Sequence, residues 1–194
     1  MERFAFIIHP LEIEDVARKF PSAQRMPASW LESLLRHSPP IKASHIKGVR
    51  SLQGTEAEGW FIGCLLTSKQ MMELPEQDVL DKIIKSARKA EQLGAGIVGL
   101  GAFTAVVGDA GVTVAENVGI AVTTGNSYTV ATALEGIRYA ADLMDVSIAD
   151  ASVTVLGATG SIGSACARIL ARDAGNMTMA ARSLDRLEEL ASRI

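Results

Sequence analysis

The chain has 194 residues, of which 48% are hydrophobic and 21% charged, with a formal net charge of −3. That composition is typical of a soluble globular protein, and the length suits one large domain or two small ones. The small negative charge offers no basic field for nucleic acid or an anionic membrane, so we expect neither as a partner. No apolar run approaches the roughly 20 residues of a transmembrane helix.

The amino-terminal segment has an apolar core of only five residues, 4–8, with acids soon after it. It therefore predicts a strand and not a signal peptide. Cys64 and Cys166 lie in apolar runs without metal-ligand spacing, which predicts buried thiols in a reducing cytoplasm. Three histidines lack the spacing of a metal site or catalytic triad, so we predict structural or surface roles and no metal. They are His9, His37 and His45.

In chain order, the first half alternates strand-like and helix-like patterns. We predict a buried strand at 4–8, helices at 11–20 and 28–37, and an antiparallel hairpin of 41–51 with 59–67. Prolines 39 and 40 end the second helix, because proline lacks the N–H and clashes with the preceding turn. The acids of 54–59 are interpreted as part of a solvated loop.

The clearest helix is 76–93, where one apolar stripe faces charges on the other side. The stripe consists of Val79, Leu80, Ile83, Ile84, Ala87 and Ala90. Gly94 is a plausible residue for a left-handed helix end. Strands at 96–101 and 118–124 and a long helix at 127–145 follow. This alternation predicts an α/β fold with a mostly parallel sheet.

We place a domain boundary near 145–151. Residues 1–146 are predicted to form an α/β substrate or catalytic domain, and 147–194 part of a Rossmann domain limited to β-α-β-α. Because a mononucleotide-binding half needs βαβαβ, we expect a truncated site and an inactive chain when it stands alone. An unpaired sheet edge would invite self-association, so a homo-oligomer is an open expectation.

The stretch "SVTVLGATGSIGSACARIL" (152–170) has the elements of a pyrophosphate site: an apolar strand, a glycine turn and a small-residue helix. The first glycine permits the turn, the second lets backbone approach the phosphates, and the third allows close helix–strand packing. The spacing is G-x-x-G-x-x-G, so a turn that merely needs glycines is the alternative. The cofactor-binding candidates are Gly157, Ala158, Thr159, Gly160, Ser161, Ile162 and Gly163.

The next predicted strand, 176–182, ends at Arg182 and Ser183. A carboxylate there would hold the ribose hydroxyl of NAD, but none occurs before Asp185. An arginine and a hydroxyl suit a 2′-phosphate, which favours NADPH. A compatible alternative makes Ser183 a helix N-cap beside a solvated Arg182.

The turn "TTGNS" also joins a strand to a helix and is predicted to line a substrate cleft, since ligands gather at the carboxyl ends of strands. Its candidates are Thr123, Thr124, Gly125, Asn126 and Ser127. The alternative makes Asn126 or Ser127 the N-cap of the long helix. The glycine-rich 99–111 lines the same cleft or forms a close-packed loop.

Three stretches together, "GLGAFTAVVGDAG", "TTGNSYTVATAL" and "VTVLGATGSIGSA", resemble the long-chain acyl-[acyl-carrier-protein] reductases and related shikimate/quinate-type or amino-acid dehydrogenases. The resemblance implies an NADPH-dependent reduction of an acyl thioester, on a carrier protein or CoA, to an aldehyde. It also implies a cysteine nucleophile beyond the glycine turn. Neither Cys64 nor Cys166 matches that position, so no nucleophile is assigned. A dehydrogenase for a polar substrate and a non-catalytic nucleotide-binding module are the alternatives.

Overall fold

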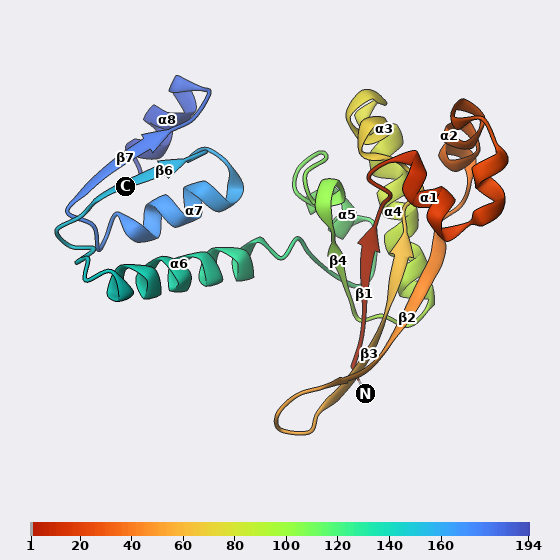
Figure 1. Ribbon diagram of the computed structural model, residues 1–194, viewed down its shortest axis with the longest axis horizontal. Helices are drawn as coiled ribbons and strands as arrows, with labels where there is room; N and C mark the ends of the chain where they lie inside the picture. The colour runs from red at the N-terminus through yellow and green to blue at the C-terminus, as the bar shows by residue number, and fades with distance from the viewer. Residues whose placement is uncertain (1) are drawn as a thin grey trace. The chain divides into compact units, whose positions relative to one another are not determined.

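The computed structural model describes residues 2–194 and divides into two compact units, residues 1–124 and residues 125–194. Both units alternate strands and helices, and every pairing between strands is parallel except the β2–β3 pair (Figure 1). The prediction of an α/β fold with a mostly parallel sheet is confirmed.

The first unit is built on a five-stranded sheet in the order β2-β3-β1-β4-β5. β2 and β3 form the predicted antiparallel hairpin, and β1, β3, β4 and β5 run parallel. The strands are β1 (Glu2–Ile8), β2 (Ile41–Arg50), β3 (Glu56–Gly63), β4 (Ile97–Leu100) and β5 (Ala121–Thr123). The carboxyl ends of the parallel strands therefore share one edge of the sheet.

Helix α4 (Glu76–Gln92) covers one face of this sheet. All six residues of its predicted apolar stripe are buried, and all but Leu80 belong to one core cluster with Ala5 and Ile7 of β1 and Trp60 and Ile62 of β3. Gly94 has a φ of +84°, as expected for a left-handed helix end. Two short helices, α3 (Ser68–Glu73) and α5 (Val112–Glu116), add Met71 and Val114 to the same core.

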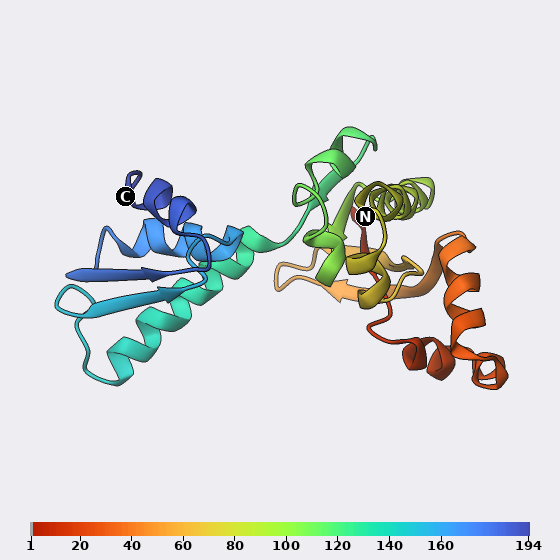
Figure 2. The same cartoon turned by 90° about the horizontal axis from the view of Figure 1, so that it is seen from above.

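A smaller apolar cluster lies under the amino-terminal helices. It joins α1 (Ile13–Lys19), the 3₁₀ helix η1 (Pro21–Arg25) and α2 (Ala28–His37) through Val16, Ala23, Leu31 and Leu35. Seen from above, α4 and α1 lie on opposite sides of the sheet (Figure 2). Helix α2 ends at His37, directly before Ser38 and the two prolines that were predicted to stop it.

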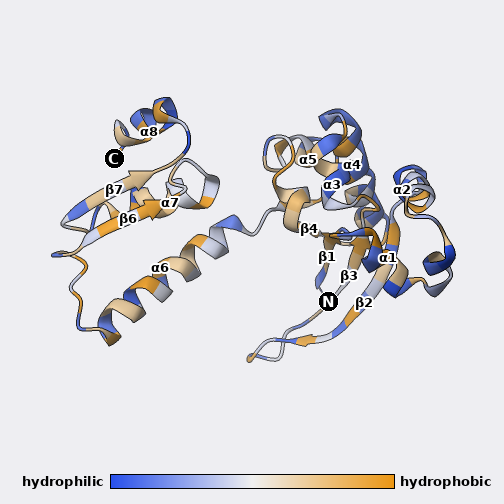
Figure 3. Ribbon diagram, turned by 45° about the horizontal axis from the view of Figure 1, so that its top comes forward, coloured by the Kyte–Doolittle hydropathy of each residue, from blue (hydrophilic) through white to orange (hydrophobic). Residues whose placement is uncertain are grey.

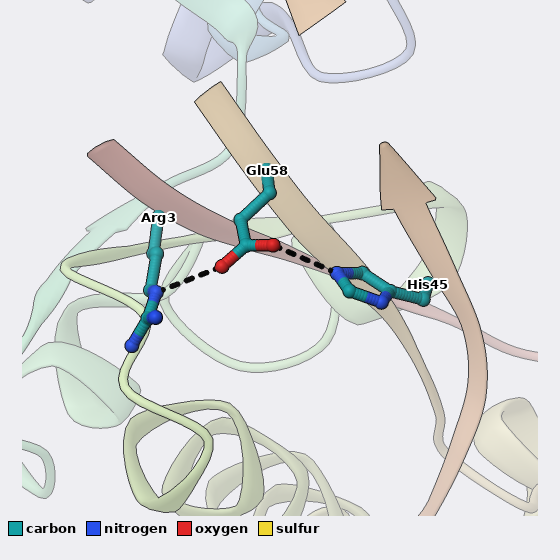
Figure 4. A network of polar contacts seen from close by, with 3 residues as sticks. All are labelled: Arg3, His45 and Glu58. Atoms are coloured by element: carbon teal, nitrogen blue, oxygen red, sulfur yellow. Dashed lines mark hydrogen bonds and ion pairs between the residues drawn. The ribbon is translucent and has the colours of Figure 1, made fainter. Parts of the chain in front are cut away.

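The prediction of a solvated loop at 54–59 is wrong for its second half. Glu56 and Glu58 lie in β3, and Glu58 accepts hydrogen bonds from Arg3 Nε at 3.0 Å and pairs with His45 Nε2 at 3.1 Å (Figure 4). Partial burial raises the pKa of Glu58, but the contacts to His45 and Arg3 outweigh it and hold this pKa below its usual value. Residues 56–59 form a strand because they pair with β1 on one side and β2 on the other. The residue pattern of this segment alone does not show that pairing.

The second unit packs three helices against the parallel strands β6 (Ser152–Leu156) and β7 (Asn176–Ala180). The helices are α6 (Asn126–Leu143), α7 (Ser161–Leu170) and α8 (Leu184–Ala191). Val130 and Leu134 of α6 pack on Cys166 and Leu170 of α7. These contacts group α6 with the second unit, whereas the sequence puts a domain boundary after residue 146. Where the chain divides into independently folding domains stays a prediction.

Candidate functional site

The glycine turn joins the end of β6 to α7 in the second unit. Gly157 has a φ of +75°, a left-handed conformation that strains any residue with a side chain. The backbone N–H groups of Gly157 and Ala158 donate to the carbonyl of Ala180 at 2.8 and 3.1 Å, which ties the turn to the end of β7. The N–H of Gly160 donates to the carbonyl of Gly157 at 3.0 Å and closes the turn.

Gly163 allows α7 to begin directly against this turn. A Cβ at position 163 would overlap the carbonyl oxygen of Gly157 and would lie 2.9 Å from its carbonyl carbon and 3.2 Å from Ala158 Cα. A Cβ at Gly160 would lie 3.3 Å from the same carbonyl oxygen. All of these neighbours are backbone atoms, so no side chain can rotate away. Small residues are therefore required where the helix meets the turn.

The first turn of α7 presents unpaired backbone donors. Gly160 is the N-cap, and the helical hydrogen bonds begin with Ser164 N to Gly160 O at 2.8 Å. The N–H groups of Ser161, Ile162 and Gly163 precede the first acceptor within the helix. They are donors for an anion, and the helix dipole adds a partial positive charge.

A hydrogen bond joins the start of α6 to the start of α7. Asn126 Nδ2 donates to Ser161 Oγ at 3.0 Å. The structure gives the N-cap position of α6 to Gly125, with a φ of +74°, so the alternative with Asn126 or Ser127 as N-cap is wrong. Gly125, Asn126 and Ser127 thus begin the second unit beside the glycine turn, whereas Thr123 and Thr124 end the first unit.

Arg182 and Ser183 lie between the end of β7 and the start of α8. Ser183 occupies the N-cap position, but its side chain makes no capping hydrogen bond. Arg182 is exposed. Asp185 is the second residue of α8. The strand tip thus offers a guanidinium and a hydroxyl without a carboxylate at the tip itself.

No sequence pattern identified Arg186 as a residue of the candidate site. Its Nη2 donates to the carbonyl of Thr159 at 3.0 Å, so α8 is linked to the glycine turn. Arg186, Arg193 and Glu189 line a small pocket of about 150 Å³ beside Thr159 and Ser164. A signal was present, because an N-cap at Ser183 puts Arg186 in the first turn of α8, beside the strand end.

The glycine-rich segment 99–111 packs on the core of the first unit. It contains the 3₁₀ helix η2 (Ala102–Ala105), and Thr104 within it is 1% exposed. A Cβ at Gly101 would lie 2.6 Å from the carbonyl oxygen of Ile7. These contacts support the close-packed alternative for this segment.

His9 connects this segment to the end of β1. Its Nε2 accepts a hydrogen bond from the N–H of Phe103 at 3.2 Å, and its Nδ1 lies 2.9 Å from the carbonyl of Pro10. This pattern fits a neutral ring with the proton on Nδ1. His9 also lines an apolar pocket of about 220 Å³ with Phe20 and Leu65.

Neither cysteine has the surroundings of a nucleophile. Both are buried and unpaired. Burial raises the pKa of Cys64 to about 11, with Ser86 and Lys82 opposing the shift. Such a thiol is protonated at neutral pH and unreactive. Within residues 2–194, no cluster of His, Cys, Asp or Glu side chains is arranged to hold a metal ion. In the same part of the chain, no helix is long and apolar enough to cross a membrane.

Comparison with known proteins gives distant similarities, and no family model matches the chain. The chain is 25% identical over 174 residues to the aminotransferase PigE of a Serratia species, which covers 87% of this chain and 20% of that protein. It is 26% identical over 162 residues to the long-chain acyl-[acyl-carrier-protein] reductase of Synechococcus elongatus, covering 75% of this chain and 46% of that protein. The chain thus spans less than half the length of these curated relatives. Its resemblance to such reductases is supported as a distant similarity.

Proposed function

We propose that this chain belongs to an NADPH-dependent oxidoreductase that reduces an acyl thioester to an aldehyde. The observation that carries the cofactor part is the glycine turn, where three glycines bring a helix start, a strand end and open backbone donors together. The reductase part comes from the similarity to the acyl-[acyl-carrier-protein] reductase.

The glycine turn of the second unit supports binding of the pyrophosphate part of a dinucleotide. The turn from Gly157 to Gly160 leaves open space beside Gly157, where a Cβ would meet nothing within 4 Å. The N–H groups of Ser161, Ile162 and Gly163 would hold the pyrophosphate, with Ser161 positioned by Asn126. When bound, NADPH would supply the hydride.

The strand tip supports NADPH over NADH. Arg182 is exposed and free of ion pairs among the described residues, and the Ser183 hydroxyl is not used for capping. A guanidinium can hold a 2′-phosphate through two parallel hydrogen bonds. Asp185 already lies in α8, so no carboxylate at the tip competes for the ribose hydroxyl.

The chemistry on the acyl group is not assigned to a residue of this chain. We do not assign Cys64 or Cys166 as the acyl-accepting thiolate, and the burial of both side chains agrees with this. Two unpaired thiols also fit the cytoplasmic location that we propose.

An aminotransferase activity, as the name of the other relative suggests, is not favoured for the second unit. Pyridoxal-phosphate enzymes hold their cofactor through a lysine Schiff base. Residues 125–194 contain no lysine, although they contain six arginines. The glycine turn therefore has no lysine within its own unit for that chemistry.

Calorimetric titration of the chain with NADPH and with NADH tests the cofactor assignment. We expect binding of NADPH that is at least about tenfold tighter, since the 2′-phosphate adds a charge-assisted pair. Equal affinities, or no binding of either, would remove the assignment. The reaction is tested separately, by following aldehyde formation from long-chain acyl thioesters with the full-length protein. Turnover of a polar hydroxy acid in place of the thioester would refute it.

A further inference from the structure

A groove of about 700 Å³ on the first unit collects basic side chains on a chain whose net charge is negative. It runs between the end of α2, the two prolines after it and one face of α4. Its cations are Arg36, Lys82, Lys85, Arg88 and Lys89, and no carboxylate is among its lining residues. Helices α2 and α4 are coloured largely hydrophilic in Figure 3.

Three of these cations make contacts that hold elements of the fold together. Arg36 pairs with Asp78 at 3.3 Å, which links α2 to α4. Lys82 Nζ donates to the carbonyls of Leu35 and Ser38 at 3.2 and 2.5 Å and so satisfies the end of α2. Arg88 Nε donates to the carbonyl of Asn117 at 3.2 Å. The fold explains why these three residues are basic.

Lys85 and Lys89 form no ion pair with the described residues. They lie one turn apart on α4, and no carboxylate of residues 2–194 is within ion-pair distance of either. Like charges at this spacing repel each other and weaken a helix. The repulsion also reaches Lys82: burial lowers the pKa of its ammonium group, and the charge of Lys85 lowers that pKa further. Lys89 lies in the last turn of α4, where a cation favours the helix dipole, but no described carboxylate engages either lysine, so both are available to a ligand.

The arrangement fits an extended acidic surface better than a single phosphate. From Lys82 to Lys89 the cations follow α4 for about 10 Å, whereas a phosphate needs donors that converge on one point. The unengaged cations are two flexible lysines, which act through their field more than through fixed geometry. The groove has no Phe, Tyr or Trp side chain for stacking a nucleic-acid base, and its one ring, that of His37, lies with Nδ1 2.8 Å from the carbonyl of Ser33. Carboxylates spaced along a helix would complement such a row.

We propose that this groove docks an acidic helical face of the carrier protein that holds the acyl thioester. The proposal rests on the proposed function, since it names the partner that delivers the substrate. It uses charge complementarity, with Lys85 and Lys89 as the residues that attract the partner and Pro39 and Pro40 forming part of the wall of the groove.

The test measures the anisotropy of a fluorescently labelled holo-acyl carrier protein titrated with the full chain. The variant Lys85→Glu/Lys89→Glu should bind at least about tenfold more weakly, and wild-type binding should weaken as salt is raised. The matched control is Lys47→Glu/Lys69→Glu, which makes the same change in net charge at two exposed lysines elsewhere on the unit. It should change the affinity by less than about twofold. Circular dichroism of each variant confirms folding.

Several outcomes would overturn the proposal: no binding by the wild type, an unchanged affinity of the groove variant, or an equal loss in the control. Displacement of the carrier by coenzyme A alone would show a phosphate site instead, and tight binding of duplex DNA at the same lysines would show a nucleic-acid site. NADPH titration of the same samples separates the two proposals. If NADPH fails to bind while the carrier docks through Lys85 and Lys89, the proposed function fails and the docking surface stands.

Discussion

Replacement of Gly163 by alanine is the sharpest test of the glycine turn. The added Cβ would overlap the carbonyl oxygen of Gly157 and approach two further backbone atoms to 2.9 and 3.2 Å. Since backbone cannot rotate away, the start of α7 must move off the end of β6. The N–H donors of the first turn move with it, so both packing and cofactor binding should suffer.

The magnitude follows from two opposing effects. Overpacking against an unyielding surface costs up to about 3 kcal/mol. Alanine in place of glycine in a helix raises the unfolding free energy by about 1 kcal/mol. The net expectation is therefore a loss of about 2 kcal/mol of unfolding free energy. Gly136→Ala in α6 is the matched control, because a Cβ there meets nothing within 4 Å and only the favourable effect of about 1 kcal/mol remains.

Hydrogen exchange measured by mass spectrometry can localise this effect. A loss of about 2 kcal/mol should speed exchange of the α7 amides about 30-fold, while Gly136→Ala should slow exchange in the second unit. Trp30 and Trp60 both lie in the first unit, so their fluorescence reports whether that unit is unaffected. If Gly163→Ala exchanged and bound NADPH like the wild type, the close contact between α7 and the turn would be refuted.

Four further predictions concern single residues. Arg182→Ala should weaken NADPH about tenfold in calorimetry and leave NADH unchanged, and an equal loss for both would contradict the 2′-phosphate role. Arg186→Ala should weaken both nucleotides alike, because it removes the bond to Thr159 that supports the turn. The pKa of Glu58 is lowered in the folded state, so its ionised form adds stability above about pH 4.5. That stability is lost as the pH falls through the folded-state pKa. Glu58→Gln should therefore show a smaller drop in Tm than the wild type between about pH 5 and pH 3. Native Cys64 should resist iodoacetamide at about pH 8 by mass spectrometry and react only after unfolding.

The order and type of the longer elements could be predicted because each carries its own period. The stripe of α4, the stop after His37 and the glycine at position 94 are all local signals, and the structure places each as expected. Helices α3 and α5 and the two 3₁₀ helices were missed, since segments of four to six residues are too short to show a period.

Some features of the candidate site could also be predicted from local sequence, and others could not. The glycine spacing predicted the turn from Gly157 to Gly163, because backbone conformation and close approach constrain residue type locally. The role of Arg186 was not predicted, since its contact to Thr159 joins residues 27 positions apart. The N-cap of α6 fell to Gly125 and not to Asn126, whose amide is used instead across helices.

By itself the sequence determined the α/β alternation, the hairpin, the main helix faces and the glycine turn, because these depend on periodicity and on the conformational limits of glycine and proline. Only the tertiary structure decided which side chains meet. It paired Glu58 with Arg3 and His45, packed α6 on α7, and gathered cations from α2 and α4 into one groove. The physical reason is that cross-strand register and helix packing bring together residues far apart in the chain, and no local pattern encodes those contacts.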